Sequence, residues 1–151
     1  MTDLEKLVAI NEIHCLMARR VRALDAHDWE TYEACHAEDH VSAGPQWNPG
    51  GGRKAMMDAL KKNMDGIRHI HFVHSPMIEI LSPTEARGFW TLEDYLYWKQ
   101  GDEDHWFHGW GHYDDTYGVR DGQWLFTSRR LSYMRKEHSP GSRREGEGNG
   151  S

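Results

Sequence analysis

Cysteine is scarce in this sequence, and the N-terminus has no long uncharged stretch. Only Cys15 and Cys35 occur among the 151 residues, which excludes a scaffold held together by several disulfides. Both cysteines lie in segments with a helical pattern, where a buried, reduced thiol is the usual state. Because Asp3, Glu5 and Lys6 charge the N-terminus, we expect no signal peptide and no membrane-spanning segment there. The sequence predicts a soluble, cytoplasmic protein that has no membrane partner.

Positive charge is also in short supply. The 18 lysines and arginines are outnumbered by 24 aspartates and glutamates, so the formal net charge is −6. Little cationic surface remains for a phosphate backbone, and we expect no nucleic-acid partner. With 38% hydrophobic residues and seven tryptophans, the chain is too apolar for a disordered protein. Its length suits one domain, predicted at residues 1–136, followed by a Gly- and Ser-rich flexible tail at residues 137–151.

Helical patterns fill the first part of the chain. Apolar residues recur every three or four positions over residues 4–24, which predicts a long amphipathic helix. A short second helix is predicted over residues 28–38, with the Asp28 side chain as its N-cap. Prolines and three consecutive glycines predict a loop at residues 45–52, and a third helix follows over about residues 53–64.

Alternating patterns follow after Gly66. Three long strand-like runs lie between residues 67 and 133, with turn signals at Ser82-Pro83 and Asp121-Gly122 and a further turn at residues 100–104. Helices followed by a meander of long antiparallel strands are typical of an α+β domain, in which the helices pack on one face of a curved sheet.

Asp25 and two histidines are the first candidates for chemistry. Asp25 stands where the first helix ends, a place where an aspartate often serves only as a cap. His69 and His71 are two apart in a strand, so their side chains share one face. A single histidine there is more often structural than catalytic, and the functional interpretation therefore needs a partner for each residue.

Two further charged residues lie on strand faces that are otherwise apolar or small. Asp94 is the one charge on its face, and a carboxylate there needs a donor, for which a histidine on the neighbouring strand is suitable. The alternative is that this face bends out to solvent at Asp94. Gly109 and Gly111 within a strand suggest room for a ligand, and Arg129 is predicted to be a lone cation. The residues that share the face of Asp94 are Trp90, Leu92, Leu96 and Trp98.

These features together resemble the SnoaL-like branch of the NTF2-like superfamily over roughly residues 4 to 134. The resemblance rests on Leu24-Asp25, Asp28-Trp29, Ile70-His71-Phe72 and the run from Asp121 to Phe126 ahead of Arg129. It implies an NTF2-like cone-shaped α+β barrel, in which three N-terminal helices close a strongly curved antiparallel sheet around a deep apolar pocket. The branch includes dehydratases, a dehydrochlorinase and polyketide cyclases.

The resemblance also implies roles for individual residues. In several members an aspartate at the end of the first helix orients a histidine of the first long strand, which removes a proton; Asp25 and His71 stand at the matching positions. Asp94 matches a second acidic residue of the following strand, and Arg129 matches an arginine after the D-G-x-W run. Arg20 stands where some members have tyrosine or lysine, so the leaving group and the substrate are not determined.

A cofactor-independent lyase is the function we expect from this arrangement. Asp25 would orient His71 as a general base, and Arg129 or Arg20 would stabilise negative charge on oxygen. Dehydration of a hydrophobic, aromatic or polycyclic hydroxylated compound is favoured, and loss of formaldehyde would use the same base. This chemistry fits the catabolism of aromatic compounds. The residues expected to bind the substrate are Arg20, His69, Trp90, Leu92 and Tyr113.

Three other interpretations stay open. In the first, the domain is a noncatalytic binding module; a fold does not fix a function, so this interpretation is compatible with the resemblance. In the second it is an isomerase or a polyketide cyclase, which loses no group from its substrate. The third is a zinc or iron site formed by His69, His71, His108 and His112; these residues lack a compact ligand motif, so we expect no metal and no other cofactor. The resemblance implies a homodimer or homotrimer.

Overall fold

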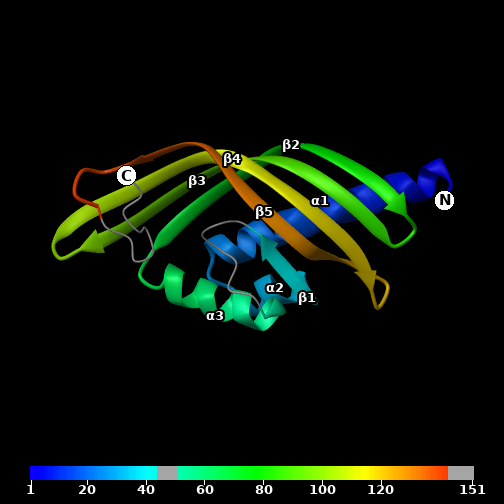
Figure 1. The fold of residues 1–151 in the computed structure, drawn as a ribbon, viewed down its shortest axis with the longest axis horizontal. Helices are drawn as coiled ribbons and strands as arrows, with labels where there is room; N and C mark the ends of the chain where they lie inside the picture. The colour runs from blue at the N-terminus through cyan, green and yellow to red at the C-terminus, as the bar shows by residue number, and fades with distance from the viewer. Residues whose placement is uncertain (44–50, 143–151) are drawn as a thin grey trace.

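The protein is an arched sheet with its helices in the hollow of the arch (Figure 1). The computed structural model describes residues 1–43 and 51–142. Residues 44–50, which include most of the loop predicted at residues 45–52, and residues 143–151 of the predicted tail lie outside this range. The elements in chain order are α1 (Asp3–Asp25), α2 (Trp29–Ala34), β1 (His36–Ala43), α3 (Gly52–Met64), β2 (Arg68–Ser82), β3 (Glu85–Gln100), β4 (Glu103–Arg120) and β5 (Gln123–His138).

The five strands form one open sheet with the order β1-β5-β4-β3-β2. Strands β2 to β5 are the predicted antiparallel meander, and its turns fall where the sequence indicated. The NTF2-like α+β class is confirmed, but the sheet is mixed, because β1 pairs with β5 in parallel. In the register, His71 of β2 lies opposite Asp94 of β3, which lies opposite Gly109 of β4. This row begins at β2, directly beneath the end of α1.

The predicted second helix is too long, because its last residues form β1 instead. Helix α2 begins after the Asp28 cap, as predicted, with the Asp28 carboxylate 3.1 Å from the backbone nitrogen of Thr31. It ends at Ala34, and the chain turns at Cys35 to run along β5. The imidazole of His36 is buried against the ring of Phe126 in β5, so tertiary contacts override the local helical pattern.

Helix α1 packs on the sheet with its C-terminal two thirds, while its first turns extend beyond the sheet (Figure 1). Leu4, Leu7 and Val8 are therefore exposed, although they continue the predicted apolar stripe. The cysteines also differ from the expectation, since Cys15 is exposed and only Cys35 is buried; both are free thiols. No helix within the described residues is both long and apolar enough to cross a membrane.

Two apolar clusters hold the helices in place. The larger joins α1 to the inner face of the sheet, and the smaller joins the end of α1 to α2 and α3. Together they fix the point at which α1 ends over β2. The first cluster contains Ile13, Leu16, Met17, Trp90, Leu92, Tyr113 and Phe126; the second contains Leu24, Tyr32, Met56, Met57, Leu60 and Met64.

A bulge in β5 changes the face that its second half presents. Thr116 of β4 pairs with Ser128 and Tyr117 pairs with Phe126, so Thr127 has no partner of its own in the register. The extra residue interrupts the alternation along the strand. Arg129 therefore shares the inner face with Phe126, although regular alternation would place these two side chains on opposite faces.

Candidate functional site

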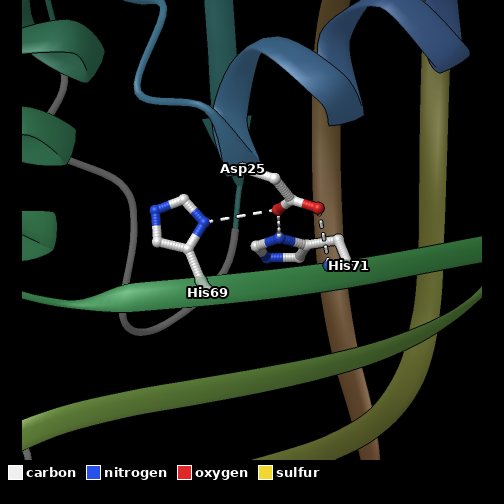
Figure 2. A group of neighbouring side chains, drawn as sticks. All are labelled: Asp25, His69 and His71. Atoms are coloured by element: carbon white, nitrogen blue, oxygen red, sulfur yellow. Dashed lines mark hydrogen bonds and ion pairs between the residues drawn. The ribbon is translucent and has the colours of Figure 1, made fainter.

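Asp25 holds His71 at two points. Its Oδ1 lies 2.7 Å from Nδ1 of the imidazole, and its Oδ2 accepts a hydrogen bond of 3.0 Å from the backbone nitrogen of the same residue. Figure 2 shows the carboxylate at the end of α1, directly above β2. Two contacts to one residue fix both the ring and the strand against the helix end. The sequence prediction that these residues meet agrees with this geometry.

His69 and His27 extend the same group of polar side chains. Nδ1 of His69 lies 3.4 Å from Oδ1 of Asp25 (Figure 2), and its Nε2 lies 2.8 Å from Nε2 of His27, where the rings also stack. The backbone of His27 has a φ of 55°, a left-handed conformation that is uncommon outside glycine. His27 thus turns back from the loop after α1 to contact β2.

The electrostatics of this group determine the proton positions. Burial alone would raise the pKa of Asp25, but the hydrogen bonds from His69 and His71 outweigh it and lower the pKa to about 2. At neutral pH the carboxylate is charged and only accepts hydrogen bonds, so Nδ1 of His71 carries the proton that it donates. In the neutral ring, the lone pair is then on Nε2. This is the tautomer that a general base requires.

Asp94 lies on the inner face in the register position opposite His71. It is buried, so the alternative in which the strand turns this residue out to solvent is wrong. A tyrosine is a donor to it: the hydroxyl of Tyr133 lies 2.5 Å from Oδ2 of Asp94. Gly109 completes the row, and a Cβ there would collide with the Asp94 carboxylate and the Tyr133 ring. The glycine therefore makes room for a polar pair.

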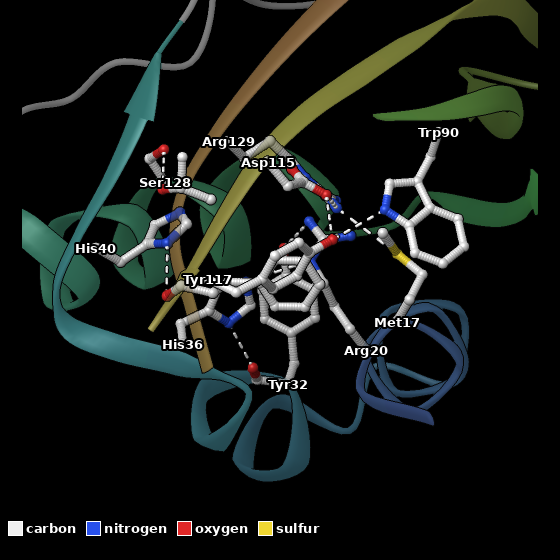
Figure 3. A network of polar contacts seen from close by, with 12 residues as sticks. Met17, Arg20, Tyr32, His36, His40, Trp90, Asp115, Tyr117, Ser128 and Arg129 are labelled. Carbon is white, nitrogen blue, oxygen red and sulfur yellow. Dashed lines mark hydrogen bonds and ion pairs between the residues drawn. The ribbon is translucent and has the colours of Figure 1, made fainter. Parts of the chain in front are cut away.

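Arg129 is buried but is not the lone cation predicted. Its Nε and Nη2 each lie 2.7 Å from an oxygen of Asp115, which is fully buried (Figure 3). The guanidinium also stacks on the ring of Tyr113, at 3.5 Å from the ring centre. Burial alone would lower the pKa of Arg129, but the adjacent Asp115 holds it above the usual value. The hydroxyl of Tyr117 donates to the same carboxylate and accepts from Trp90.

Arg20 is a buried residue of α1, the helix that packs on the inner face of the sheet. Its Nε lies 3.2 Å from Nε2 of His36 and its Nη2 lies 2.6 Å from the hydroxyl of Tyr32 (Figure 3). Burial and the nearby Arg20 hold the pKa of His36 well below its usual value, and burial lowers that of His40 to about 4. Both histidines are thus neutral at neutral pH. Within the described residues, Nη1 of Arg20 and Nη1 of Arg129 are buried and have no hydrogen-bond partner.

A cavity of about 670 Å³ opens beside Asp25 and His69. It runs along the start of β2, where apolar and aromatic side chains complete its wall. Of the residues predicted to bind a substrate, only His69 lines this cavity. Trp90, Leu92 and Tyr113 belong to the core cluster between α1 and the sheet. The complete lining is Asp25, His27, Ile67, Arg68, His69, Ile70 and Tyr97.

The histidines considered as metal ligands do not gather in one place. His108 and His112 alternate with the buried Gly109 and Gly111, so they lie on the outer face of the sheet. On the inner face, however, Asp25, His69 and His71 offer one ligand atom each, and these atoms lie within 4.8 Å of one another. Within the described residues, this is the group of at least three donors that suits a metal ion.

The sequence does not indicate several of the partners at this site. Tyr133 lies in β5, with β4 between it and Asp94, and its ring reaches the carboxylate over Gly109, where the missing side chain leaves room. Asp115 shares the parity of Tyr113, which is a signal for an inward position, but the bulge that brings Arg129 to it has no marker in the sequence. His27 follows the helix end by two residues, and only its left-handed backbone directs it to His69.

Comparisons with known proteins agree with this fold. The SnoaL-like domain family matches residues 5–130. A crystal structure of a candidate scytalone dehydratase from Novosphingobium aromaticivorans DSM 12444 is 28% identical, with a TM-score of 0.79 over 91% of each chain. A hexachlorocyclohexane dehydrochlorinase, LinA type 2, is 16% identical, with a TM-score of 0.81 over 93% of this chain and 95% of the other. A protein of unknown function from Mycobacterium tuberculosis is 24% identical, with a TM-score of 0.74 over 89% of this chain and 78% of the other.

Proposed function

The chain belongs to the SnoaL-like domain family of the NTF2-like superfamily, and we propose that it is a cofactor-independent lyase in which His71 is the general base. One observation carries the proposal: Asp25 binds both Nδ1 and the backbone nitrogen of His71. This contact fixes the ring and the tautomer, so that Nε2 is available to accept a proton. The His71 side chain is only 7% exposed, which keeps competing water largely away from the base.

The reaction that this base favours is a β-elimination. His71 removes a proton from a carbon atom of the substrate, and the electron pair of that C–H bond forms the new double bond. The hydroxyl on the adjacent carbon leaves and takes up a proton to become water. Alternatively, the base removes the O–H proton of a hydroxymethyl group. The bond that joins this group to the rest of the substrate then breaks, and formaldehyde leaves. The electron pair of the broken bond stays on the remaining carbon, which takes up a proton. Neither reaction needs an oxidant or a reductant.

Other inner-face residues have supporting roles in this proposal. Asp94 accepts a hydrogen bond from Tyr133 and lies opposite His71, and in this proposal it would contact the group that leaves the substrate. Arg20 and Arg129 each keep one buried Nη1 without a described partner, and these donors would stabilise negative charge that develops on a substrate oxygen. The apolar and aromatic side chains that line the cavity favour a hydrophobic, aromatic or polycyclic hydroxylated substrate; these are Ile67, Ile70 and Tyr97.

The first experiment is a turnover assay by mass spectrometry. Purified protein without added metal or cofactor is incubated with hydroxylated aromatic, steroid and polyketide compounds. We expect a product that has lost water or formaldehyde with the wild type and with His74→Ala, a change of an exposed histidine in the same strand. His71→Ala should produce neither loss. A product of unchanged mass would favour an isomerase or a cyclase, and retained ligand without product would favour a binding module.

Asp25→Asn tests the orienting role on the substrate found in this way. We expect kcat to fall by about 10²- to 10⁴-fold, because the amide cannot stabilise the charged imidazolium. Circular dichroism and the melting temperature serve to check that the variant folds. If a folded Asp25→Asn protein kept most of the turnover, the Asp25–His71 pair would not be the catalytic unit.

A further inference from the structure

We propose that Asp25, His69 and His71 also form a binding site for a divalent transition-metal ion, with Zn²⁺ as the best fit. A carboxylate and two imidazoles are a donor set that zinc prefers. All three side chains come from rigid elements, the end of α1 and the start of β2, so the site does not have to be assembled from loops. His69 distinguishes the metal site from the Asp25–His71 pair, because the metal ion uses it as a ligand whereas the base mechanism does not use it.

The distances suit a small ion. Oδ1 of Asp25 lies 2.7 Å from Nδ1 of His71 and 3.4 Å from Nδ1 of His69, and the three ligand atoms lie within 4.8 Å of one another. Zinc bonds of about 2.0–2.1 Å in a tetrahedral site place neighbouring ligand atoms about 3.3 Å apart. Zinc binding therefore requires the contact between Asp25 Oδ1 and His71 Nδ1 to widen from its present 2.7 Å.

His27 provides the support that a zinc-bound histidine needs. A metal on Nδ1 of His69 requires the proton of that ring to be on Nε2, and Nε2 of His27 lies 2.8 Å away to accept it. Without metal, the same contact works in reverse, with His27 as the donor and His69 as the acceptor. The imidazole pair therefore keeps its hydrogen bond in both states. Partners of this kind typically change metal affinity by about 10- to 100-fold.

The site also has an open side. Asp25, His27 and His69 line the cavity of about 670 Å³, so water can complete the coordination of an ion bound there. A site with three protein ligands and one open position binds metal without a further side chain. Asp25 is the most open of the three ligands, with 27% of its side chain exposed, and it gives the ion a route from solvent.

Metal binding and base catalysis exclude one another at this site. A metal ion on Nδ1 of His71 places the ring proton on Nε2, which then donates a hydrogen bond and has no lone pair with which to remove a proton. The ion also binds the carboxylate of Asp25, which in the metal-free protein orients the ring. Zn²⁺ is therefore expected to inhibit the lyase reversibly; this consequence rests on the proposed function, whereas the metal site itself does not.

The experiment measures binding first and turnover second. Isothermal titration with ZnCl₂ is carried out on chelator-treated full-length protein, and the visible spectrum after Co²⁺ addition reports the coordination geometry. Wild type is compared with His69→Gln, which removes a ligand, and with His27→Asn, in which asparagine tolerates the left-handed backbone. His108→Gln is the matched control, because this histidine lies on the outer face of the sheet.

We expect one tight Zn²⁺ per chain in the wild type and in His108→Gln. Affinity should fall about 10- to 100-fold in His27→Asn and further in His69→Gln. Each variant is compared with its own metal-free rate, and inhibition by Zn²⁺ should weaken in the same order and be reversed by a chelator. Equal binding by wild type and His69→Gln would overturn the site. If Zn²⁺ raised turnover, the inference that metal binding and base catalysis exclude one another would be wrong. If the protein had no turnover, Zn²⁺ binding and the Co²⁺ spectrum would still test the metal site.

Discussion

The Arg129–Asp115 pair shows how strongly a single buried charge depends on its partner. Asp115 is fully buried and binds Arg129 through two hydrogen bonds. Asp115→Ala leaves the guanidinium charged in a site that water does not reach. We expect the free energy of unfolding to fall by about 3–5 kcal/mol, as measured by urea denaturation.

The neighbouring aspartate supplies the control for this prediction. Asp114 binds Arg87 in an equivalent two-point contact, but this pair lies on the exposed face of the sheet. Asp114→Ala should lower the free energy of unfolding by less than about 1 kcal/mol, because solvent screens the charge that remains. A similar cost for the two variants would mean that burial does not determine the strength of the Arg129–Asp115 pair.

At the level of single residues, the sequence predicts a side chain better than its partners. The position of Asp25 at a helix end and of His71 in the first long strand is enough to pair them through the family resemblance. Asp94 is recognisable as a charge that needs a donor, yet the donor Tyr133 comes from a strand two places away in the sheet. Long-range partners of this kind depend on the strand order and register of the sheet, which the alternation of residues along one strand does not encode.

Strand β4 comes unusually close to its neighbours at Gly109. A Cβ at this position would overlap with the carboxylate of Asp94 and the ring of Tyr133. Gly109→Ala therefore has to displace the Asp94–Tyr133 pair, and we expect a loss of stability of about 1–3 kcal/mol together with reduced turnover. Melting temperature and urea denaturation measure the first effect, and the assay described above measures the second.

Gly122 offers a comparison in the turn between β4 and β5. Nothing lies within 4 Å of a Cβ built there, but its φ of 76° is left-handed. Asparagine tolerates this conformation, so Gly122→Asn should leave stability and turnover nearly unchanged. If Gly109→Ala were equally harmless, the strand would have to adjust without moving Asp94, and the close approach would have no role in the site.

The sequence predicts the elements unequally well. Strands β2 to β5 follow from long alternating runs with clear turn residues, because local pattern and final pairing agree there. The start of β1 is predicted as part of a helix, since its residues lack a clear alternation and gain strand structure only by pairing with β5. The bulge at Thr127 escapes prediction for a similar reason: threonine is an ordinary strand residue, and only the pairing with β4 reveals the extra position.

Buried neutral histidines make the stability of the whole molecule depend on pH. The pKa of His40 is lowered to about 4 in the folded protein, and that of His36 is also lowered, whereas an unfolded histidine has a pKa of about 6.5. Below pH 6.5 the unfolded chain binds more protons than the folded one, so stability falls as the pH decreases from about 6.5 to about 4. Urea denaturation at pH 7 and pH 5 should reveal this loss.

His40→Gln separates this effect from other acid-sensitive groups. The amide keeps a donor for the carbonyl of Phe126, to which Nδ1 of His40 lies at 3.1 Å, but it does not titrate. We expect the difference in stability between pH 7 and pH 5 to shrink by about 1–2 kcal/mol in this variant. An unchanged difference would show that His40 does not contribute to the pH dependence.

Two properties of the whole molecule stay predictions. The homodimer or homotrimer follows from the family resemblance, and the exposed Ile70 and Phe72 on the outer face of β2 offer apolar surface for it. The identity of the substrate depends on the shape of the pocket. Loop paths determine that shape, and residue patterns do not specify the path of a loop rich in proline and glycine.

The bulge in β5 allows Arg129 to face inward although it stands three residues after the inward-facing Phe126. In a regular strand, side chains three residues apart point to opposite faces of the sheet. Deletion of Thr127 would place Arg129 two residues after Phe126, where regular alternation puts both side chains on the inner face. The loss of one codon at the bulge is therefore an evolutionary change that this fold can accept while it keeps the buried pair of Arg129 and Asp115.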